Sequence, residues 1–230
     1  MKKLIIALAI VAIASVAQAE LLASWTSTAA NNLAGGNYAQ TAFGTTDYTF
    51  SMVSGSGFTA GGTPAGGTFA GAGADAADAA TAYADGQYVA FTWDTDYTLA
   101  ISFAEAMYSR AATGAPNAQW GTIIASTWTS IGTAITAIST ATPTTSTAPI
   151  QTTFTGVSGL TSGQLCLAFY GGSSSANTAW VRLDSRPSAT PDVALVLDGT
   201  MTPVGVPEPA TMSLLGLGAL AMVLRRKMSK

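Results

Sequence analysis

Apolar and polar residues alternate in short runs through the middle of the chain, and Gly, Pro, Ser or Asp bound most of them. Alternation with a period of two places successive side chains on opposite faces of a β-strand. The runs lie at 48–52, 88–93, 99–104, 118–128, 150–154, 165–170, 180–184 and 193–198. Several short strands of this kind predict an all-β fold, a single β-sandwich or jelly-roll-like domain.

The segment 118–138 carries two competing patterns. Alternation from Trp120 to Trp128 favours a strand. Helical spacing is carried by a stripe of apolar residues: Ile124, Trp128, Ile131, Ile135 and Ile138. Thr and Ile dominate this segment, and β-branched residues are mediocre helix formers. We therefore predict a strand over 118–128 and leave 129–138 unassigned.

Small residues dominate two further stretches. Residues 54–73 include eight glycines, and 74–84 are rich in alanine, so both are expected to be loop-like. A short helix is the alternative for 74–84, because Ala favours helix and Asp75 and Asp78 would suit its first turn. Residues 139–149 are a connector of Ser, Thr and Pro. None of these separates two cores, so a single domain is expected.

The chain is thinly charged: Lys, Arg, Asp and Glu make up 9% of its 230 residues, against about 25% in an ordinary domain. It contains no His, which excludes a Ser-His-Asp triad, a Cys-His dyad and His-ligated zinc or haem. Residues 20–206 carry three cations and eleven anions, a net charge of −8. The sparse basic residues argue against nucleic acid as a partner, and no cofactor is expected.

The N-terminus has the three parts of a secretory signal peptide. Lys2 and Lys3 form a basic region, 4–16 are apolar, and Ala17 and Ala19 form an A-x-A cleavage site before residue 20. The alternative is an uncleaved membrane anchor, for which the apolar stretch is short. We predict that 1–19 are removed by signal peptidase after export.

The C-terminus also has three parts in order. Val-Pro-Glu-Pro at 206–209 precedes fifteen uncharged residues at 210–224 and a basic cluster at 225–230. As a helix, the apolar part would reach about 22 Å, short of the roughly 30 Å of a bilayer core. We predict a short transmembrane helix with its basic end in the cytoplasm. The residues expected to direct sorting are Val206, Pro207, Glu208, Pro209, Arg225, Arg226 and Lys227.

This tail resembles the PEP-CTERM sorting signal of Gram-negative bacteria. The resemblance implies recognition by an exosortase, a membrane transpeptidase-like enzyme, and cutting within the motif. Family members are exported, often by organisms that make exopolysaccharide. The chain is thus expected to comprise a signal peptide (1–19), an exported β-sandwich domain (20–203) and a sorting signal (204–230). We expect it at the periplasm, outer surface or cell exterior, with a transient inner-membrane intermediate.

The body carries a weaker resemblance to exported domains of the same family. In these, a Phe-Tyr-Gly strand and a small-residue loop precede a Trp strand that ends in Asp. The corresponding segments here are 169–171, 172–178 and 180–184. Residues 185–191 depart from the pattern by separating Asp184 from the next apolar strand. The resemblance implies a β-sandwich of unknown activity.

Candidate chemistry in the body is sparse. Trp25 and Trp128 lie beside Thr and Ser, so they are the tryptophans expected to be exposed and able to stack on sugar rings. Asp94 and Asp96 form a fragment of a calcium site, which would need six to eight oxygen ligands. Glu105 could serve a glycosidase only with a second carboxylate nearby.

Two further residue types are expected to be structural. Cys166, between two leucines, is expected to be a buried core residue rather than a nucleophile. Arg110 and Arg182 are expected to balance nearby carboxylates. We therefore predict an exported protein with a structural or matrix-associated role and no catalysis, with exopolysaccharide as a candidate partner. The alternatives are a carbohydrate-binding module acting through exposed tryptophans and a glycosidase using Glu105.

Overall fold

The computed structural model describes residues 20–26, 31–32, 37–39, 50–60, 69–140, 148–173, 180–183 and 193–204. Ala19–Thr202 form one compact unit, which we call the body. Within the described residues the body is mostly strand, with one short helix, α2 (Ala79–Ala84). The predicted signal peptide and sorting helix lie outside the described residues.

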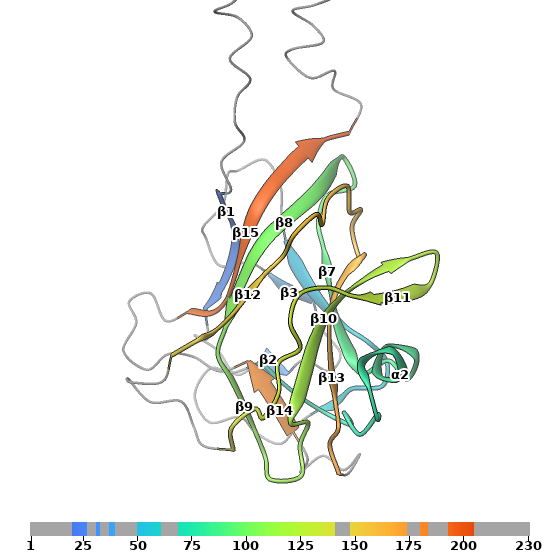
Figure 1. Cartoon of the computed structure of the whole chain (residues 1–230), viewed down its shortest axis with the longest axis vertical. Helices are drawn as coiled ribbons and strands as arrows, with labels where there is room; N and C mark the ends of the chain where they lie inside the picture. The colour runs from blue at the N-terminus through green and yellow to red at the C-terminus, as the bar shows by residue number, and fades with distance from the viewer. Residues whose placement is uncertain are drawn as a thin grey trace, which may run out of the picture. The chain divides into compact units, whose positions relative to one another are not determined.

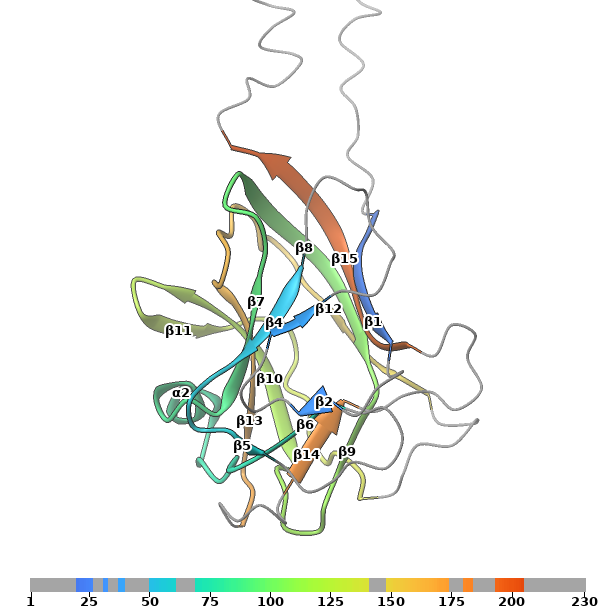
Figure 2. The same ribbon diagram turned by 180° about the vertical axis from the view of Figure 1, so that it is seen from behind.

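The described strands form three sheets (Figures 1 and 2). The four-stranded sheet has the order β1 (Glu20–Thr26), β15 (Val193–Pro203), β8 (Tyr97–Ala106) and β12 (Ile150–Thr153). The six-stranded sheet has the order β11 (Thr127–Ser130), β10 (Asn117–Ile124), β13 (Leu165–Tyr170), β7 (Tyr88–Thr92), β4 (Ser51–Ser54) and β3 (Asn37–Ala39). The third sheet has five strands, in the order β2 (Asn31–Asn32), β6 (Phe69–Ala72), β14 (Trp180–Leu183) and β9 (Tyr108–Arg110), with β5 (Thr59–Ala60) also paired to β6.

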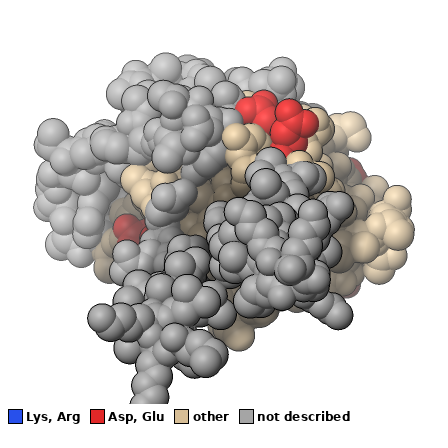
Figure 3. All heavy atoms as spheres, turned by 90° about the horizontal axis from the view of Figure 1, so that it is seen from above, with Lys and Arg blue, Asp and Glu red and all other residues tan. Residues whose placement is uncertain are grey.

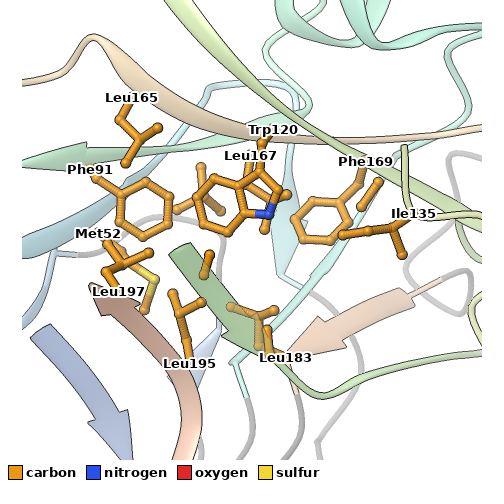
Figure 4. Close-up of a cluster of buried hydrophobic side chains, with 14 of the residues drawn as sticks. Met52, Phe91, Trp120, Ile135, Leu165, Leu167, Phe169, Leu183, Leu195 and Leu197 are labelled. Atoms are coloured by element: carbon orange, nitrogen blue, oxygen red, sulfur yellow. The ribbon is translucent and has the colours of Figure 1, made fainter. Parts of the chain in front are cut away.

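The four- and six-stranded sheets share one hydrophobic core (Figure 4). Trp120 of β10 lies at its centre, fully buried, with its ring centroid 5.3 Å from Phe91 and 5.7 Å from Phe154. Leu195 and Leu197 of β15 enter the same core from the four-stranded sheet. Two sheets closed over one core are consistent with the predicted all-β sandwich.

The predicted strands at 88–93, 99–104, 150–154, 165–170, 180–184 and 193–198 are confirmed, with small differences at their ends. In β7 the alternation reflects one buried and one exposed face, since Val89 and Phe91 are buried between more exposed neighbours, whereas β13 is buried from Leu165 to Phe169. The sequence analysis missed β1 and the short strands β2, β3 and β9. Runs of two or three residues are too short to show a period.

The segment 118–138 is neither one continuous strand nor a helix. It forms a hairpin, in which β10 and β11 pair from Gly121–Ser130 to Ile124–Thr127 across a turn at Ala125 and Ser126. Both turn residues have positive φ, 50° and 61°, as a two-residue hairpin turn requires. Alternation correctly predicted strand geometry but could not locate the turn. The helical spacing of the apolar residues from Ile124 to Ile138 does not correspond to a helix in the structure.

Strand pairing also reaches into the glycine-rich stretch. The loop expected over 54–73 is wrong at Thr59–Ala60 and Phe69–Ala72, which are β5 and β6. The helix alternative for 74–84 is confirmed by α2, and the backbone N–H of Thr81 donates to Asp78 Oδ1 at 2.8 Å as an N-cap. Asp78 thus caps the helix and does not lie in its first turn.

Candidate functional site

The first and last strands of the body are hydrogen-bonded neighbours. β1 and β15 run antiparallel, and Glu20 at the start of β1 pairs with Gly199 near the end of β15. The two ends of the body therefore lie together at one end of the four-stranded sheet (Figures 1 and 2). The residues predicted to direct processing lie outside the described residues: Ala17, Ala19, Val206, Pro207, Glu208, Pro209, Arg225, Arg226 and Lys227.

β15 is anchored on its other side by β8. Ser102 Oγ donates to the carbonyl oxygen of Asp198 at 3.2 Å, and Thr98 Oγ1 donates to that of Thr202 at 3.3 Å. The last strand is thus an internal strand of its sheet, bonded to the body as far as Thr202. Only the residues after it are left to connect the body to the tail.

Trp128 was predicted to be exposed, but it is half-buried on the outer face of the six-stranded sheet. Its ring lies against Gly121, where a Cβ atom would collide with the indole. Its centroid is 5.9 Å from that of Tyr83, and its Nε1 donates to Ser130 Oγ at 3.1 Å. Trp25 pairs with Leu195 through its backbone, and its side chain lies outside what the structure describes.

Trp128 belongs to a group of partly exposed rings around α2, which we call the α2 aromatic cluster: Tyr83, Tyr88, Trp128 and Tyr170. Three of these rings pack on buried alanines of α2, the preceding loop and β13. Tyr83 lies 4.9 Å from Tyr88 between ring centroids. Partial burial raises the pKa of both Tyr88 and Tyr170, so their phenols are neutral at physiological pH.

A buried glutamine supports this cluster, and the sequence analysis missed it. Gln87 Oε1 accepts from the backbone N–H of Ala76 at 3.0 Å, and its Nε2 donates to Asp75 Oδ1 at 2.8 Å. Its backbone oxygen accepts from Phe169 N–H at 3.1 Å. The sequence signal was a lone polar residue between the alanine-rich stretch and a strand, which does not specify its partners.

Asp94 and Asp96 lie exposed in the turn between β7 and β8. The turn is closed by the backbone N–H of Tyr97, which donates to the carbonyl oxygen of Asp94 at 3.2 Å. Within the described residues, no group of three or more Cys, Asp or Glu side chains could hold a metal ion. The described part of the body therefore adds no third carboxylate to this pair.

Glu105 has a second carboxylate nearby, as a glycosidase would require. Its Oε2 accepts from Gln151 Nε2 at 2.7 Å across β8 and β12. Asp198, on the neighbouring strand β15, has a pKa raised first by burial and then by the negative charge of Glu105. Both carboxylates are partly exposed and lie on strands of the four-stranded sheet.

The thiol of Cys166 is buried, as predicted, and burial raises its pKa to about 12. It is therefore a thiol at physiological pH, which makes it a poor nucleophile.

The described partners of the Arg110 side chain are backbone carbonyl oxygens. Its guanidinium donates to those of Ile138, Ala111, Ala112 and Gly114. Arg110 thus fastens the loop after β9. The side chain of Arg182 lies outside the described residues.

A comparison with protein families identifies the segment that follows the last strand of the body. Residues 205–227 match the family model of the PEP-CTERM protein-sorting motif. The match confirms the predicted motif and supports an exosortase-targeted, exported protein of the cell envelope or surface. No curated protein and no solved structure matches the chain. Across the described residues, no helix has both the length and the apolar character needed to span a bilayer.

Proposed function

We propose that this chain is cut within 206–209 by an exosortase and that its body works outside the inner membrane as a non-catalytic structural or matrix-associated protein. The sorting motif carries the proposal: the match begins at residue 205, two residues after the last strand ends at Pro203. The first strand begins at Glu20, directly after the expected signal-peptidase site. A folded body would thus occupy nearly all of the chain between the two processing sites.

The tail has the physical properties that this processing needs. Its basic end is costly to move across the membrane, so export should stop with the motif at the outer face. Pro207 and Pro209 disfavour helix, and an extended segment fits the cleft of a processing enzyme. The partner named by the motif is the exosortase.

The residues present support a non-catalytic role. The sequence has no His to act as a base, and the described Cys166 is held as a buried thiol. Glu105 Oε2 accepts a hydrogen bond from the side chain of Gln151 on the neighbouring strand. These features favour a structural role over hydrolysis.

Replacing Pro207, Glu208 and Pro209 with Ala tests the processing step. In cells carrying the exosortase, this variant should remain in the membrane fraction at the higher mass, while the parent is released. Thr211→Ala, which lies after the Val-Pro-Glu-Pro segment at 206–209, is the matched control and should be released like the parent. Release of the triple variant at the parental level would contradict the proposal.

A second candidate function is polysaccharide binding at the α2 aromatic cluster. The observation that favours it is the stacking of Tyr83 with Trp128, with both rings partly exposed. Aromatic rings of this kind combine a broad apolar face with a polar edge, which suits a sugar ring. In a pull-down with exopolysaccharide from the same organism, Tyr83→Ala should reduce retention. Ile124→Ala, which removes another exposed apolar group from the adjoining hairpin, should not. Equal retention of the two variants would exclude this site.

A further inference from the structure

The pairing of β1 with β15 places the start of the first strand and the end of the last strand at the same end of the body. Glu20, which follows the expected signal-peptidase site, lies opposite Gly199, and the two strands run antiparallel. The chain therefore enters β1 and leaves β15 at one place, which we call the exit end (Figures 1 and 2). β1 and β15 can pair only after the whole body has been exported, because they are its first and last strands.

The link between the exit end and the sorting motif is short. Thr202 is still bonded to Thr98 of β8, and five residue steps separate it from Pro207. A fully extended chain advances at most about 3.6 Å per residue, so Pro207 can be no more than about 18 Å from Thr202. That reach is smaller than the width of a small domain. An enzyme that grips the motif must therefore come against the folded body.

The exit end also carries negative charge. The antiparallel pairing of β8 with β15 brings the turn 94–96, which precedes β8, to the end where β15 finishes. Asp94, Thr95 and Asp96 are all exposed there. Figure 3 looks onto this end of the body and shows acidic side chains but no Lys or Arg among the described atoms in view. Such a surface is repelled by anionic lipid and attracted to a basic protein surface.

We propose that the exit end, formed by the start of β1, the turn 94–96 and the end of β15, is the surface that contacts the exosortase during processing. The inference rests on the proposed exosortase cleavage and adds to it which face of the body meets the enzyme. The short link makes the contact unavoidable, and the acidic turn favours a basic surface of the enzyme beside its cleft.

Site-specific photo-crosslinking tests the contact directly. A photo-reactive amino acid in place of Thr95 should crosslink to the exosortase in cells that carry both proteins. The matched control replaces Thr113, an exposed threonine in the loop between β9 and β10, at the opposite end of the body (Figure 1). Thr113 should give no crosslink. Crosslinks of equal yield from both positions, or from Thr113 alone, would overturn the proposal.

The length of the link gives a second test. Deleting Pro203 and Val204 shortens the reach by about 7 Å, and processing in a pulse-chase should slow by about tenfold or more because the motif can no longer span to the cleft. Replacing the same two residues with Gly and Ser keeps the length and should preserve the rate. Thermal unfolding of the unprocessed deletion variant in detergent should match the parent, which excludes a misfolded body.

Different results would contradict the contact at the exit end and the exosortase cleavage itself. A deletion variant processed at the parental rate would overturn the contact while leaving exosortase cleavage intact. Slow processing of the Gly-Ser variant would also overturn it, because sequence rather than reach would then be limiting. Parental processing of Glu208→Ala would instead contradict exosortase cleavage at this motif.

Discussion

The two main sheets of the body differ in how their faces are covered. In the six-stranded sheet, β13 is buried from Leu165 to Phe169 without a break, so both faces of this strand are covered. The core covers one face, and α2 with Trp128 covers the other. In the four-stranded sheet, Leu195 and Leu197 of β15 are buried, while Val196 and Asp198, which alternate with them, are partly exposed.

The two sheets therefore contribute differently, the six-stranded sheet mainly to stability and the four-stranded sheet to processing. The six-stranded sheet contains a strand that is buried on both faces. This strand contributes strongly to stability because the apolar side chains on both of its faces are removed from water. The four-stranded sheet contains the first and last strands of the body and carries the exit end. Changes to the covering of the six-stranded sheet should therefore affect unfolding, whereas changes at the end of the four-stranded sheet should affect processing.

The largest expected effect on stability is at Trp128. Trp128→Ala would uncover Gly121 and remove the contact with Tyr83, and should lower the free energy of unfolding by about 2 kcal/mol, less than the 3–5 kcal/mol typical of a fully buried aromatic. The matched change on the four-stranded sheet is Gln151→Ala, which removes an exposed hydrogen bond and should cost less than about 1 kcal/mol. Urea unfolding of both variants checks the difference. Equal losses would show that the two faces are not covered differently.

A smaller effect with a clear sign is expected at Asp198. Its folded-state pKa is raised by burial and by Glu105, so the folded protein binds this proton more tightly than the unfolded chain. Stability should therefore fall as the pH rises from about 4 through the raised pKa. Asp198→Asn should stabilise the protein at neutral pH, and the gain should vanish below about pH 4. Thermal unfolding across this range tests it, and a gain that persists in acid would contradict the electrostatic cause.

Asp78 should show the opposite sign. Hydrogen bonds from the backbone and side chain of Thr81 hold the pKa of this N-cap carboxylate below its usual range. Its contribution is present above about pH 4 and is lost as the pH falls through the lowered pKa. Asp78→Ala should therefore destabilise the protein at neutral pH and have little effect in strong acid. A loss independent of pH would point to a cause other than capping of α2.

The smallest expected effect is at Cys166. Its thiol is buried in β13 and its pKa is about 12, so a thiol-alkylating reagent at neutral pH should label it only when the body unfolds. Labelling followed by mass spectrometry should track the global unfolding transition in urea. Rapid labelling of the folded protein would show that β13 is not covered on its outer face.

The sequence predicted most strands because apolar and polar residues alternate along them, and in strands such as β7 this alternation matches one buried and one exposed face. It also predicted that Cys166 is buried, because a small apolar residue between leucines fits no other environment as well. It did not predict the turn at Ala125 and Ser126, since neither residue is a usual choice for positive φ. The supporting role of Gln87 likewise depends on partners that become neighbours only after folding.

Among the candidate functional residues, too, local features were predictable and contacts between distant segments were not. The sorting motif was predictable because its chemistry is local and its three parts follow one another along the chain. The placement of Trp128 was not, because its covering role arises from Gly121 on the facing strand and from Tyr83, 45 positions earlier in the sequence. The meeting of the two ends at β1 and β15 depends on the longest sequence separation in the body, which no local pattern records.

The most direct test of the account is the intact mass of the protein recovered outside the inner membrane from cells that carry an exosortase. The account predicts a single polypeptide that begins at Glu20 and ends within 206–209, with or without a group added at the new C-terminus. Terminal peptides identified by mass spectrometry would fix both boundaries. A released protein that still contained the basic cluster at 225–230, or that still began at Met1, would contradict the account.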